Sequence, residues 1–354
     1  MQQRHVWILC LGLLTMSCTN WMKGENAYVT PGCDGAYEIR DANGACVCNN
    51  DYLRFADRCI EREECTGKRV NNGDGTCTCF GTYAYIDDDC FTVGDTVEFG
   101  RYPQNENSPV PFPLTWQILN INDDSVLLIS QYVLEQYTYH DQQEDITWKN
   151  SNIRSYLNGL DGSHNKNGVN YEGKGFINLA FTASERKQIK TVTNTNPDVP
   201  AEGRNSMPDG PETKDRIFLT PGGNDTEDRI FLLSRDEVLD YFPTNKSRIA
   251  SPTAYALQPP ASSRRKNLYT CQITCSNDNS CDCKDGTWNN HVTNIQPCSD
   301  APCAGTLWWL RSPGNNPDRA AAVDCVGGNA FTFVDDDELG LRPALYRVVG
   351  SGEQ

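Results

Sequence analysis

Trp308-Trp309-Leu310-Arg311-Ser312-Pro313 is the stretch that decides the fold of this sequence, and Gly340-Leu341-Arg342-Pro343-Ala344-Leu345 follows it near the C-terminus. Side chains alternate between the two faces of a strand, so the adjacent tryptophans must point in opposite directions. One should fill a core, and the other should seal a second layer or lie at the surface. Between the two motifs, residues 321–324 and 331–334 are rich in strand-forming residues and flank Gly327-Gly328. This pattern predicts a terminal antiparallel meander.

Local patterns upstream of this stretch predict the other elements of a globular domain that spans residues 92–348. Alternating apolar and polar residues predict strands, and a Ser or Thr followed three positions later by Glu is the capping-box pattern of a helix start. Such boxes satisfy backbone groups, so they are folding signals and not catalytic ones. The expected elements are a strand at 93–99, a hairpin of 114–119 with 125–130, a helix at 151–157, and helices beginning after Thr182 and Ser234.

Composition and charge limit the class of protein. The chain of 354 residues has a formal net charge of −16 at pH 7, which argues against nucleic acid as a partner because phosphates require a basic surface. The same charge argues against electrostatic adsorption to anionic lipid. The 17 cysteines are too many for inert thiols in a reducing compartment, so disulfides and an extracytoplasmic location are expected.

The N-terminal residues have the pattern of an export signal. A basic start precedes an apolar run at residues 6–14, which is shorter than a transmembrane span. A small residue before Cys18 resembles the bacterial lipobox, in which the cysteine becomes lipidated, although Met16 is bulkier than that pattern expects. We therefore predict a lipoprotein-type signal peptide at 1–18, with lipid on Cys18 as the only membrane attachment, and a tether at 19–32. Ordinary secretion with cleavage nearby is the alternative.

An internal cysteine repeat follows this tether. Two copies share nearly the same spacing, and each has a turn before its Cys-x-Cys pair, Asn43-Gly44 in the first and Asp74-Gly75 in the second. Units of this size bury too little surface to fold without crosslinks, and zinc, the alternative, normally uses Cys-x2-Cys pairs. Four cysteines allow three pairings, so the connectivity stays open. The spacing resembles truncated epidermal-growth-factor-like modules. The modules span 33–59 and 65–90, with disulfide cysteines Cys33, Cys46, Cys48, Cys59, Cys65, Cys77, Cys79 and Cys90.

A second group of cysteines lies in a polar segment just before the Trp-Trp stretch. We predict a disulfide-stapled insertion at residues 271–303 with Cys271, Cys275, Cys281, Cys283, Cys298 and Cys303. Cys325 makes the number of cysteines in the mature chain odd once Cys18 carries lipid and Cys10 leaves with the signal. Because Cys325 lies in an expected core strand, a buried inert thiol is favoured over a nucleophile.

Several short motifs occur in order along the globular domain. They are residues 115–119, 153–158, 231–234, 308–313 and 340–345. Together they resemble the bacterial family of domain of unknown function 6273, over roughly residues 92–348. The resemblance implies an exported or surface protein, and that family has no established activity. Its C-terminal motifs are in turn similar to the C-type-lectin-like and formylglycine-generating-enzyme-like group, which implies an α+β fold with an antiparallel sheet and a few helices. The insertion at 271–303 departs from the family pattern.

The sequence offers few residues for catalysis. Its 4 histidines follow neither a Ser/His/Asp order nor a His-Glu-x-x-His spacing, and it contains no glycine-rich phosphate loop. The formylglycine-generating group requires a reactive cysteine pair, which Cys325 alone does not supply. We therefore predict that the protein is not an enzyme and has no resident cofactor.

Ligand binding is the favoured class. In C-type-lectin-like folds the surface beside the Trp-rich strand often carries ligands, so the resemblance implies that Trp309 could stack on a sugar ring and that Arg311 could contact a ligand. Asp335-Asp336-Asp337 could offer oxygen ligands to calcium. For these particular residues a structural interpretation is favoured over ligand binding. In it the acidic run is a solvated turn, the tryptophans belong to the core, and Arg311 and Arg342 pair with carboxylates such as Asp324.

The sequence thus predicts a bacterial envelope lipoprotein that acts in adhesion or in recognition of a glycan or protein ligand at the cell surface. A structural envelope protein without a small-molecule ligand is the alternative, and an enzyme is the third hypothesis. A glycan site should place aromatic side chains beside a shallow polar groove. A structural role should bury both tryptophans and leave an apolar patch for a partner, whereas an enzyme should have a deep pocket with convergent titratable groups.

Overall fold

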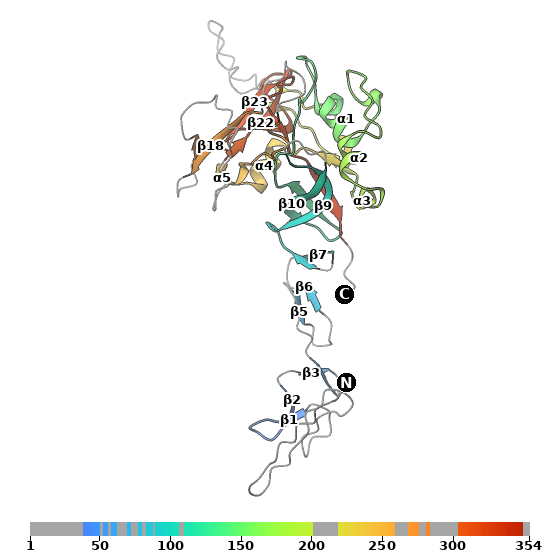
Figure 1. The fold of residues 1–354 in the computed structure, drawn as a ribbon, viewed down its shortest axis with the longest axis vertical. Coiled ribbons are helices and arrows are strands. Elements are labelled where there is room, and N and C mark those ends of the chain that lie inside the picture. The colour runs from blue at the N-terminus through green and yellow to red at the C-terminus, as the bar shows by residue number, and fades with distance from the viewer. Residues whose placement is uncertain are drawn as a thin grey trace, which may run out of the picture. The chain divides into compact units, whose positions relative to one another are not determined.

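The computed structural model describes residues 38–49, 52–55, 58–61, 69–71, 77–79, 83–87, 89–105, 110–200, 219–258, 268–275, 281–283 and 304–349 (Figure 1). By its contacts the chain divides into two units, residues 1–81 with 352–354, and residues 82–351. Several predicted features lie outside the described residues. They are the signal peptide with Cys18, the tether, and Cys33, Cys65, Cys298 and Cys303.

Short antiparallel hairpins form the described part of the first unit. Its strands pair as β1 (Glu38–Arg40) with β2 (Cys46–Cys48), β3 (Tyr52–Phe55) with β4 (Arg58–Glu61), and β5 (Arg69–Asn71) with β6 (Cys77–Cys79). At the first turn the Asp41 carboxylate accepts from the amides of Asn43 and Ala45, and Gly44 has a φ of 81°. The disulfide between Cys48 and Cys59 joins β2 to β4, and Cys46 is also disulfide-bonded. Disulfide bonds therefore crosslink this cysteine-rich part of the chain.

The last hairpin of the expected second cysteine module belongs to the globular unit. Strand β7 (Ala84–Ile86) pairs with β8 (Asp89–Phe91), and the apolar residues of β7 are buried in the main hydrophobic cluster. The Asp87 carboxylate forms an ion pair with Arg347 at 2.8 Å. The second unit therefore begins at residue 82, because this hairpin buries its apolar face against the globular core.

The first sheet of the globular unit is antiparallel, and its strands are out of sequence order. Their order is β17 (Ile230–Phe231), β25 (Ala344–Val348), β11 (Ser125–Ser130), β10 (Pro111–Ile121) and β9 (Thr96–Pro103). The predicted hairpin is β10 with β11, and at its turn the Asn122 amide donates to the Ser125 carbonyl. Strand β11 is buried along its whole length, so it lies at the centre of the core.

The second sheet contains the Trp-Trp stretch. Its order is β12 (Glu135–Gln136), β24 (Gly340–Leu341), β21 (Trp308–Pro313), β22 (Arg319–Val323) and β23 (Asn329–Phe333). Strands β21, β22 and β23 form the predicted antiparallel meander. The next two strands depart from it: β24 pairs in parallel with β21, and β25 joins the first sheet. The chain leaves β23 at the sheet edge and returns on the far side of β21, which brings β24 alongside in the parallel direction.

Both tryptophans are fully buried, and their indole nitrogens find partners in different layers. Trp308 Nε1 donates to the Arg248 carbonyl at 3.3 Å, and the Arg342 guanidinium carbon lies 4.8 Å from the centroid of the Trp308 ring. Trp309 Nε1 donates to the Tyr137 carbonyl at 2.8 Å. The alternation of the strand therefore gives each tryptophan a core layer of its own, with no ring at the surface.

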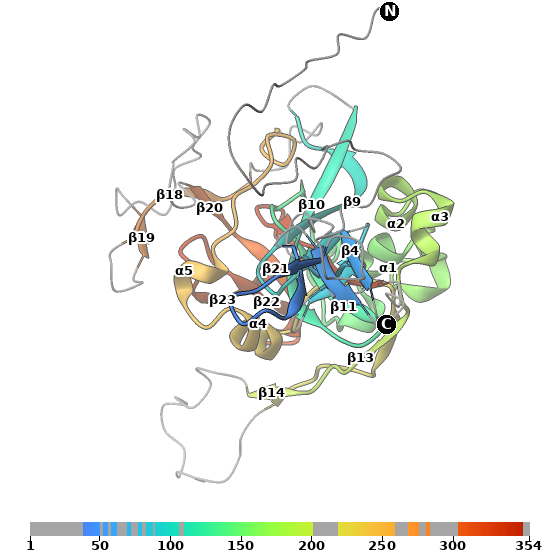
Figure 2. The same cartoon turned by 90° about the horizontal axis from the view of Figure 1, so that it is seen from below.

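The helices are short and lie on two sides of the sheets. They are α1 (Asn152–Asn158), α2 (Phe176–Ala180), α3 (Ala183–Lys187), α4 (Arg235–Tyr241) and α5 (Asn245–Arg248), with 3-10 turns at Trp148–Asn150 and Gly162–His164. Figures 1 and 2 place α1, α2 and α3 on one side of the sheets and α4 and α5 on the other. The predicted capping boxes at Thr182 and Ser234 are both complete, and Ser151 caps α1. These starts lie where the sequence predicted them because each depends on residues within one helical turn.

Paired short strands complete the described fold. They are β13 (Val192–Asn194) with β16 (Thr226–Asp228), β14 (Val199–Pro200) with β15 (Leu219–Thr220), and β18 (Thr270–Cys275) between β19 (Cys281–Cys283) and β20 (Ala304–Thr306). The described part of the chain is thus α+β and rich in sheet. None of its helices combines the length and the apolar composition needed to cross a membrane.

Cys325 is disulfide-bonded to Cys271 of β18, with a Cα–Cα distance of 6.0 Å. The prediction of a buried free thiol at Cys325 is therefore wrong. Its partner lies in the expected insertion, 54 positions away in the sequence, and the predicted pairing within that insertion left Cys325 without a partner.

A buried ion pair joins α1 to β16. Arg154 Nε donates to the Asp228 carboxylate at 2.7 Å, and the two residues are 7% and 1% exposed. The same carboxylate accepts three more hydrogen bonds, from Trp148 Nε1, Asn194 Nδ2 and Thr226 Oγ1. A buried charge is tolerated only when it is compensated in this way, so the network fixes α1 against β16.

The glycine that ends α1 gives a testable consequence of close packing. Gly159 and Gly168 have φ values of 62° and 69°, but a Cβ at Gly159 would lie 2.2 Å from Asn178 Oδ1, whereas nothing lies within 4 Å of a Cβ at Gly168. We expect Gly168→Ala to cost about 1 kcal/mol for its backbone conformation alone, and Gly159→Ala to cost about 1–3 kcal/mol more. Urea denaturation measures both variants, and equal losses would contradict the steric explanation.

Candidate functional site

A hollow of about 410 Å³ lies beside the first sheet and is lined by polar and aromatic side chains. We call it the polar hollow. Its lining comes from the β10–β11 turn, β11, β13 and its neighbours, β17, α4, β21 and β25. The lining residues are Asn122, Asp124, Ser125, Leu127, Lys190, Val192, Thr193, Asn194, Thr195, Phe231, Glu237, Arg311 and Tyr346.

An ion pair between Arg311 and Glu237 forms one part of this lining. Arg311 Nη1 donates to Glu237 Oε2, and Arg311 Nη2 donates to Glu237 Oε1 at 2.7 Å. Nη1 also donates to the Leu232 carbonyl at 3.0 Å. Glu237 Oε2 in turn accepts from the Ser234 amide in the capping box of α4. One carboxylate therefore holds both the helix start and the guanidinium in fixed positions.

A second ion pair lies at a more exposed part of the hollow. Lys190 Nζ donates to the two carboxylate oxygens of Asp124 at 3.0 and 2.8 Å. These hydrogen bonds lower the pKa of Asp124, so it stays ionised at neutral pH. The side chains of Lys190 and Asp124 are 34% and 68% exposed, and exposed pairs contribute little to stability. The pair matters instead because it fixes one positive and one negative charge in the lining of the hollow.

Strand β13 and the residue after it bring hydroxyl and amide groups to the hollow. Thr193 and Thr195 are exposed, whereas Asn194 between them is buried. Asn194 Nδ2 donates to Asp228 of the buried network at 3.0 Å, and Thr193 Oγ1 donates to a Glu227 carboxylate oxygen. The strand is thus anchored by its inward side chain while its two threonines face outward.

Tyr346 supplies an aromatic surface to the hollow. It lies in β25 opposite Leu127, and its ring stacks on Phe231 with a centroid distance of 6.1 Å and an interplanar angle of 28°. Burial raises the pKa of Tyr346, and the negative charge of Glu237 raises it further. The phenol therefore keeps its proton at neutral pH and can both donate and accept hydrogen bonds.

The side chains that line the hollow can contact a ligand through hydrogen bonds and through stacking on an aromatic ring. The two cations and two carboxylates of the lining are bonded to each other, and the remaining polar groups are hydroxyls and amides. Among the described residues, no group of three or more His, Cys, Asp or Glu side chains could hold a metal ion.

The structure separates the ligand-binding residues that the sequence predicted. Arg311 lines the polar hollow. Trp309 is fully buried, as the structural interpretation expected, so its ring cannot stack on a sugar. Asp335-Asp336-Asp337 lie away from the hollow in the turn after β23, where Asp336 accepts from Thr332 Oγ1 and from the Glu338 amide. The Asp336 carboxylate thus holds this turn together.

Arg311 pairs with a carboxylate, as the structural interpretation expected, but that carboxylate belongs to Glu237 and not to Asp324. Asp324 Oδ1 accepts from the amides of Val326 and Gly328 at 3.0 and 2.7 Å, and so builds a turn. Arg311 pairs with Glu237 instead. Arg342 donates from Nε to the Ser130 carbonyl at 3.0 Å, and burial lowers its pKa to about 9. Neither arginine pairs with Asp324, because the carboxylate already binds its own turn.

Most residues that line the hollow could not be recognised as binding residues from the sequence. Asp124, Lys190, Thr193 and Tyr346 lie in ordinary turn and strand patterns that carry no chemical motif. Glu237 was identified, but only as a capping residue. The signal that could have found Tyr346 is its place in the alternation of the last strand, which puts it on the face opposite to Leu345.

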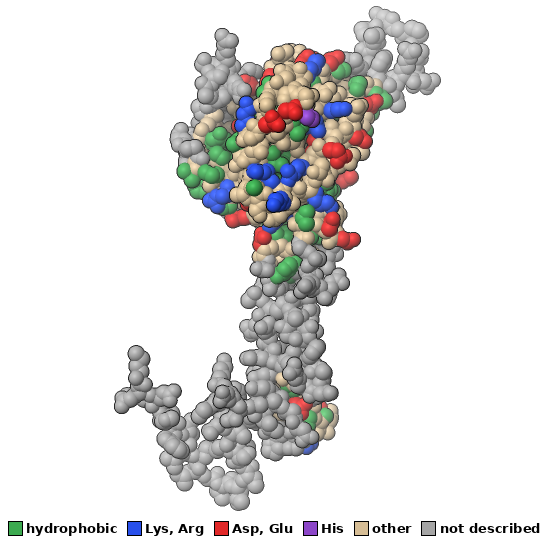
Figure 3. Space-filling view, turned by 90° about the vertical axis from the view of Figure 1, so that its right-hand side faces the viewer, with side chains coloured by type: hydrophobic (Ala, Val, Ile, Leu, Met, Phe, Trp, Pro, Cys, Tyr) green, Lys and Arg blue, Asp and Glu red, His purple; other side chains and the backbone are tan. Residues whose placement is uncertain are grey.

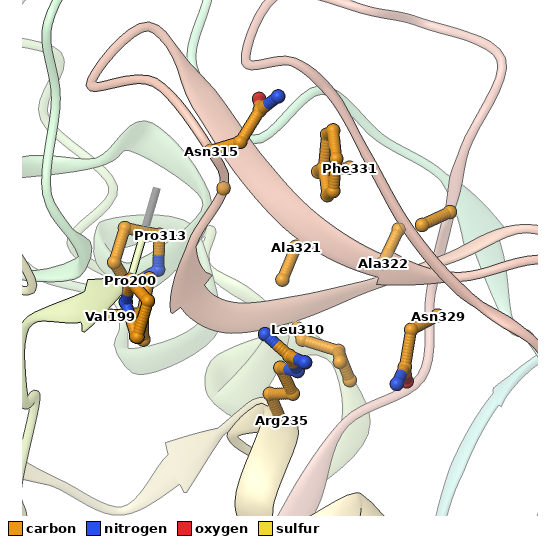
Figure 4. Close-up of a pocket in the computed structure, with 12 residues that line it drawn as sticks. Val199, Pro200, Arg235, Leu310, Pro313, Asn315, Ala321, Ala322, Asn329 and Phe331 are labelled. Atoms are coloured by element: carbon orange, nitrogen blue, oxygen red, sulfur yellow. The ribbon is translucent and has the colours of Figure 1, made fainter. Parts of the chain in front are cut away.

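A smaller cavity of about 50 Å³ lies over the meander, and Figure 4 shows it. The small side chains of Ala321 and Ala322 leave this space unfilled. Leu310 lies below them, and the ring of Phe331 lies at one side. Val199 and Pro200 approach from another part of the chain. The cavity is too small for most ligands, which need about 300 Å³ or more.

One face of the globular unit carries a group of basic side chains (Figure 3). Figure 3 shows a group of Lys and Arg side chains on the face where α1, α2 and α3 lie, with Asp and Glu side chains near it. Burial lowers the pKa of Arg229, and the charge of Arg186 in α3 lowers it further. These two cations therefore lie close to each other.

A comparison with protein families matches residues 123–346 to the family described as a domain of unknown function, DUF6273. Searches of curated proteins and of solved structures found no match to the chain. The matched segment contains the second sheet, α1 to α5 and the lining of the polar hollow from Asp124 to Tyr346. Because it covers more than half of the 354 residues, the chain belongs to the DUF6273 family.

Proposed function

We propose that this chain is a non-enzymatic bacterial envelope protein that recognises a ligand at the cell surface through the polar hollow. The observation that carries this proposal is the lining, in which an aromatic ring, exposed threonines and two ion pairs surround one space of about 410 Å³. Small-molecule sites commonly have volumes of about 300–1,000 Å³ and a few well-placed polar groups. Tyr346 supplies the aromatic face that the ligand-binding hypothesis sought in Trp309.

The proposal includes the architecture and location inferred from the sequence. The globular unit is C-type-lectin-like, and its sheet-rich α+β form with a Trp-rich strand supports this. The hairpins before it are truncated epidermal-growth-factor-like modules, supported by the disulfide between Cys48 and Cys59. Export with lipid on Cys18, or secretion, is supported by the N-terminal sequence pattern. The expected partner is a surface glycan or protein, and neither nucleic acid nor a cofactor is involved.

A structural role is the second candidate, and an apolar surface favours it. Phe331 and Phe333 of the edge strand β23 are each 38% exposed, and Leu219 of β15 is 52% exposed. Exposed aromatic side chains on a strand edge are a feature of surfaces that bind other proteins. Enzymatic activity ranks third, because the charged groups of the hollow are hydrogen-bonded to one another.

A blocking substitution tests the hollow. Thr195→Trp places a large ring in the lining, and we expect it to weaken ligand binding more than tenfold, since a filled site cannot accept its ligand. Thr191→Trp is the matched control, because Thr191 is exposed on the same segment but lies outside the lining. The measurement is binding of the chain from residue 19 onward to a glycan array, followed by titration of the glycans it retains. Equal binding by both variants would place the site elsewhere, and failure of the unmodified chain to bind any glycan would favour the structural role.

A further inference from the structure

We propose that the polar hollow selects an uncharged pyranose sugar, which lies with one face of its ring against Tyr346. This inference rests on the function proposed above and names the class of ligand for that site.

The charges of the lining exclude a charged ligand. Arg311 is bonded through both terminal nitrogens to Glu237, and Lys190 is bonded to both oxygens of Asp124. A ligand anion would meet these carboxylates beside each cation, and a ligand cation would meet the guanidinium and ammonium groups. Either charge would lose its hydration without gaining a partner of its own, and that loss is costly. A neutral ligand avoids it.

The aromatic side of the hollow favours a ring with a C–H face. The Tyr346 ring is held in position by stacking on Phe231, so little side-chain freedom remains to be lost on binding. Aromatic rings offer a large apolar face whose electrons attract weakly positive C–H groups. A pyranose presents such a face, with its hydroxyls at the rim.

The polar side of the hollow favours hydroxyl groups. Asn122, Thr193 and Thr195 are exposed side chains in the lining. Hydroxyls and amides both donate and accept hydrogen bonds, and sugar hydroxyls do the same. Tyr346 adds a third kind of donor and acceptor, because its raised pKa keeps the phenol protonated. An uncharged, hydroxyl-rich ring therefore matches each part of the lining.

Freeing Lys190 from its carboxylate tests the charge selection. The probes are the methyl glycosides of glucose, galactose and mannose, each compared with the uronic acid and the 2-amino sugar of the same epimer, by calorimetric titration. We expect the unmodified chain to bind a neutral glycoside about tenfold or more tighter than its charged counterparts.

Asp124→Asn leaves the charge of Lys190 without its carboxylate and should shift the preference about tenfold toward the uronic acid. Asp123→Asn is the matched control, because Asp123 is exposed in the same turn but lies outside the lining.

Two further results separate the parts of this inference. Tyr346→Leu should lose most of the affinity for the neutral glycoside while thermal unfolding shows that it is folded, and unchanged affinity would overturn the stacking. Equal or tighter binding of a charged sugar by the unmodified chain would overturn the charge selection, and the proposed function would stand if Thr195→Trp blocked that binding. Failure of the unmodified chain to bind any of these sugars would overturn the inference; binding of a different ligand in a manner blocked by Thr195→Trp would then leave the proposed function standing.

Discussion

Asp228→Asn is expected to lower the free energy of unfolding of the globular unit by about 3–5 kcal/mol. The substitution keeps the shape of the side chain but removes the charge that Arg154 contacts at 2.7 Å. Arg154 then remains as a buried cation without its carboxylate. The amide keeps only one acceptor oxygen, so its NH2 group faces either Arg154 or the donors of Trp148, Asn194 and Thr226. Breaking one half of a buried pair costs more than removing both halves, because the remaining charge has lost its water.

Urea denaturation followed by tryptophan fluorescence measures this change, because Trp116, Trp148, Trp308 and Trp309 are all buried in the globular unit. Asp240→Asn is the control, since Asp240 is exposed on α4, and it should change the free energy by less than about 0.5 kcal/mol. Arg154→Met, alone and combined with Asp228→Asn, should give a coupling energy above about 1 kcal/mol. A loss below that value with no coupling would contradict the assignment of this pair as the anchor of α1.

Replacing Cys271 and Cys325 together with alanine is expected to lower the free energy of unfolding by about 4 kcal/mol at 25 °C. The disulfide closes a loop of 54 positions, so its removal gives the unfolded chain much more conformational freedom. Both cysteines are buried, and the double substitution avoids leaving one free thiol in the core.

Cys48→Ala with Cys59→Ala is the matched control for this second prediction. That disulfide lies in the first unit, so its loss should leave the tryptophan transition of the globular unit unchanged. Reduction of the unmodified chain would open both disulfides at once and could not separate them. A loss of less than about 1 kcal/mol in the Cys271–Cys325 variant would show that β18 is held by other contacts.

The elements that the sequence predicted correctly depend on neighbours in the chain. Ser151, Thr182 and Ser234 cap helices because a cap needs only the amides of the next turn. The hairpin of β10 and β11 follows from two runs of strand-forming residues around a short polar turn. The alternation of a strand likewise required Trp308 and Trp309 to enter different layers. In each case the determining residues are a few positions apart.

The tertiary structure decided which distant residues meet. Asp228, Glu237 and Cys271 became the partners of Arg154, Arg311 and Cys325 across separations of 74, 74 and 54 positions. With 47 acidic residues and 17 cysteines, the sequence offers many pairings, and only the packing of sheets and helices selects among them. The polar hollow is a product of the same packing, since it combines the β10–β11 turn, β13, α4 and the last strand. The sequence by itself determined the local elements and the alternation of the core, because those follow from short-range geometry; the site required the fold, because its residues are neighbours only in space.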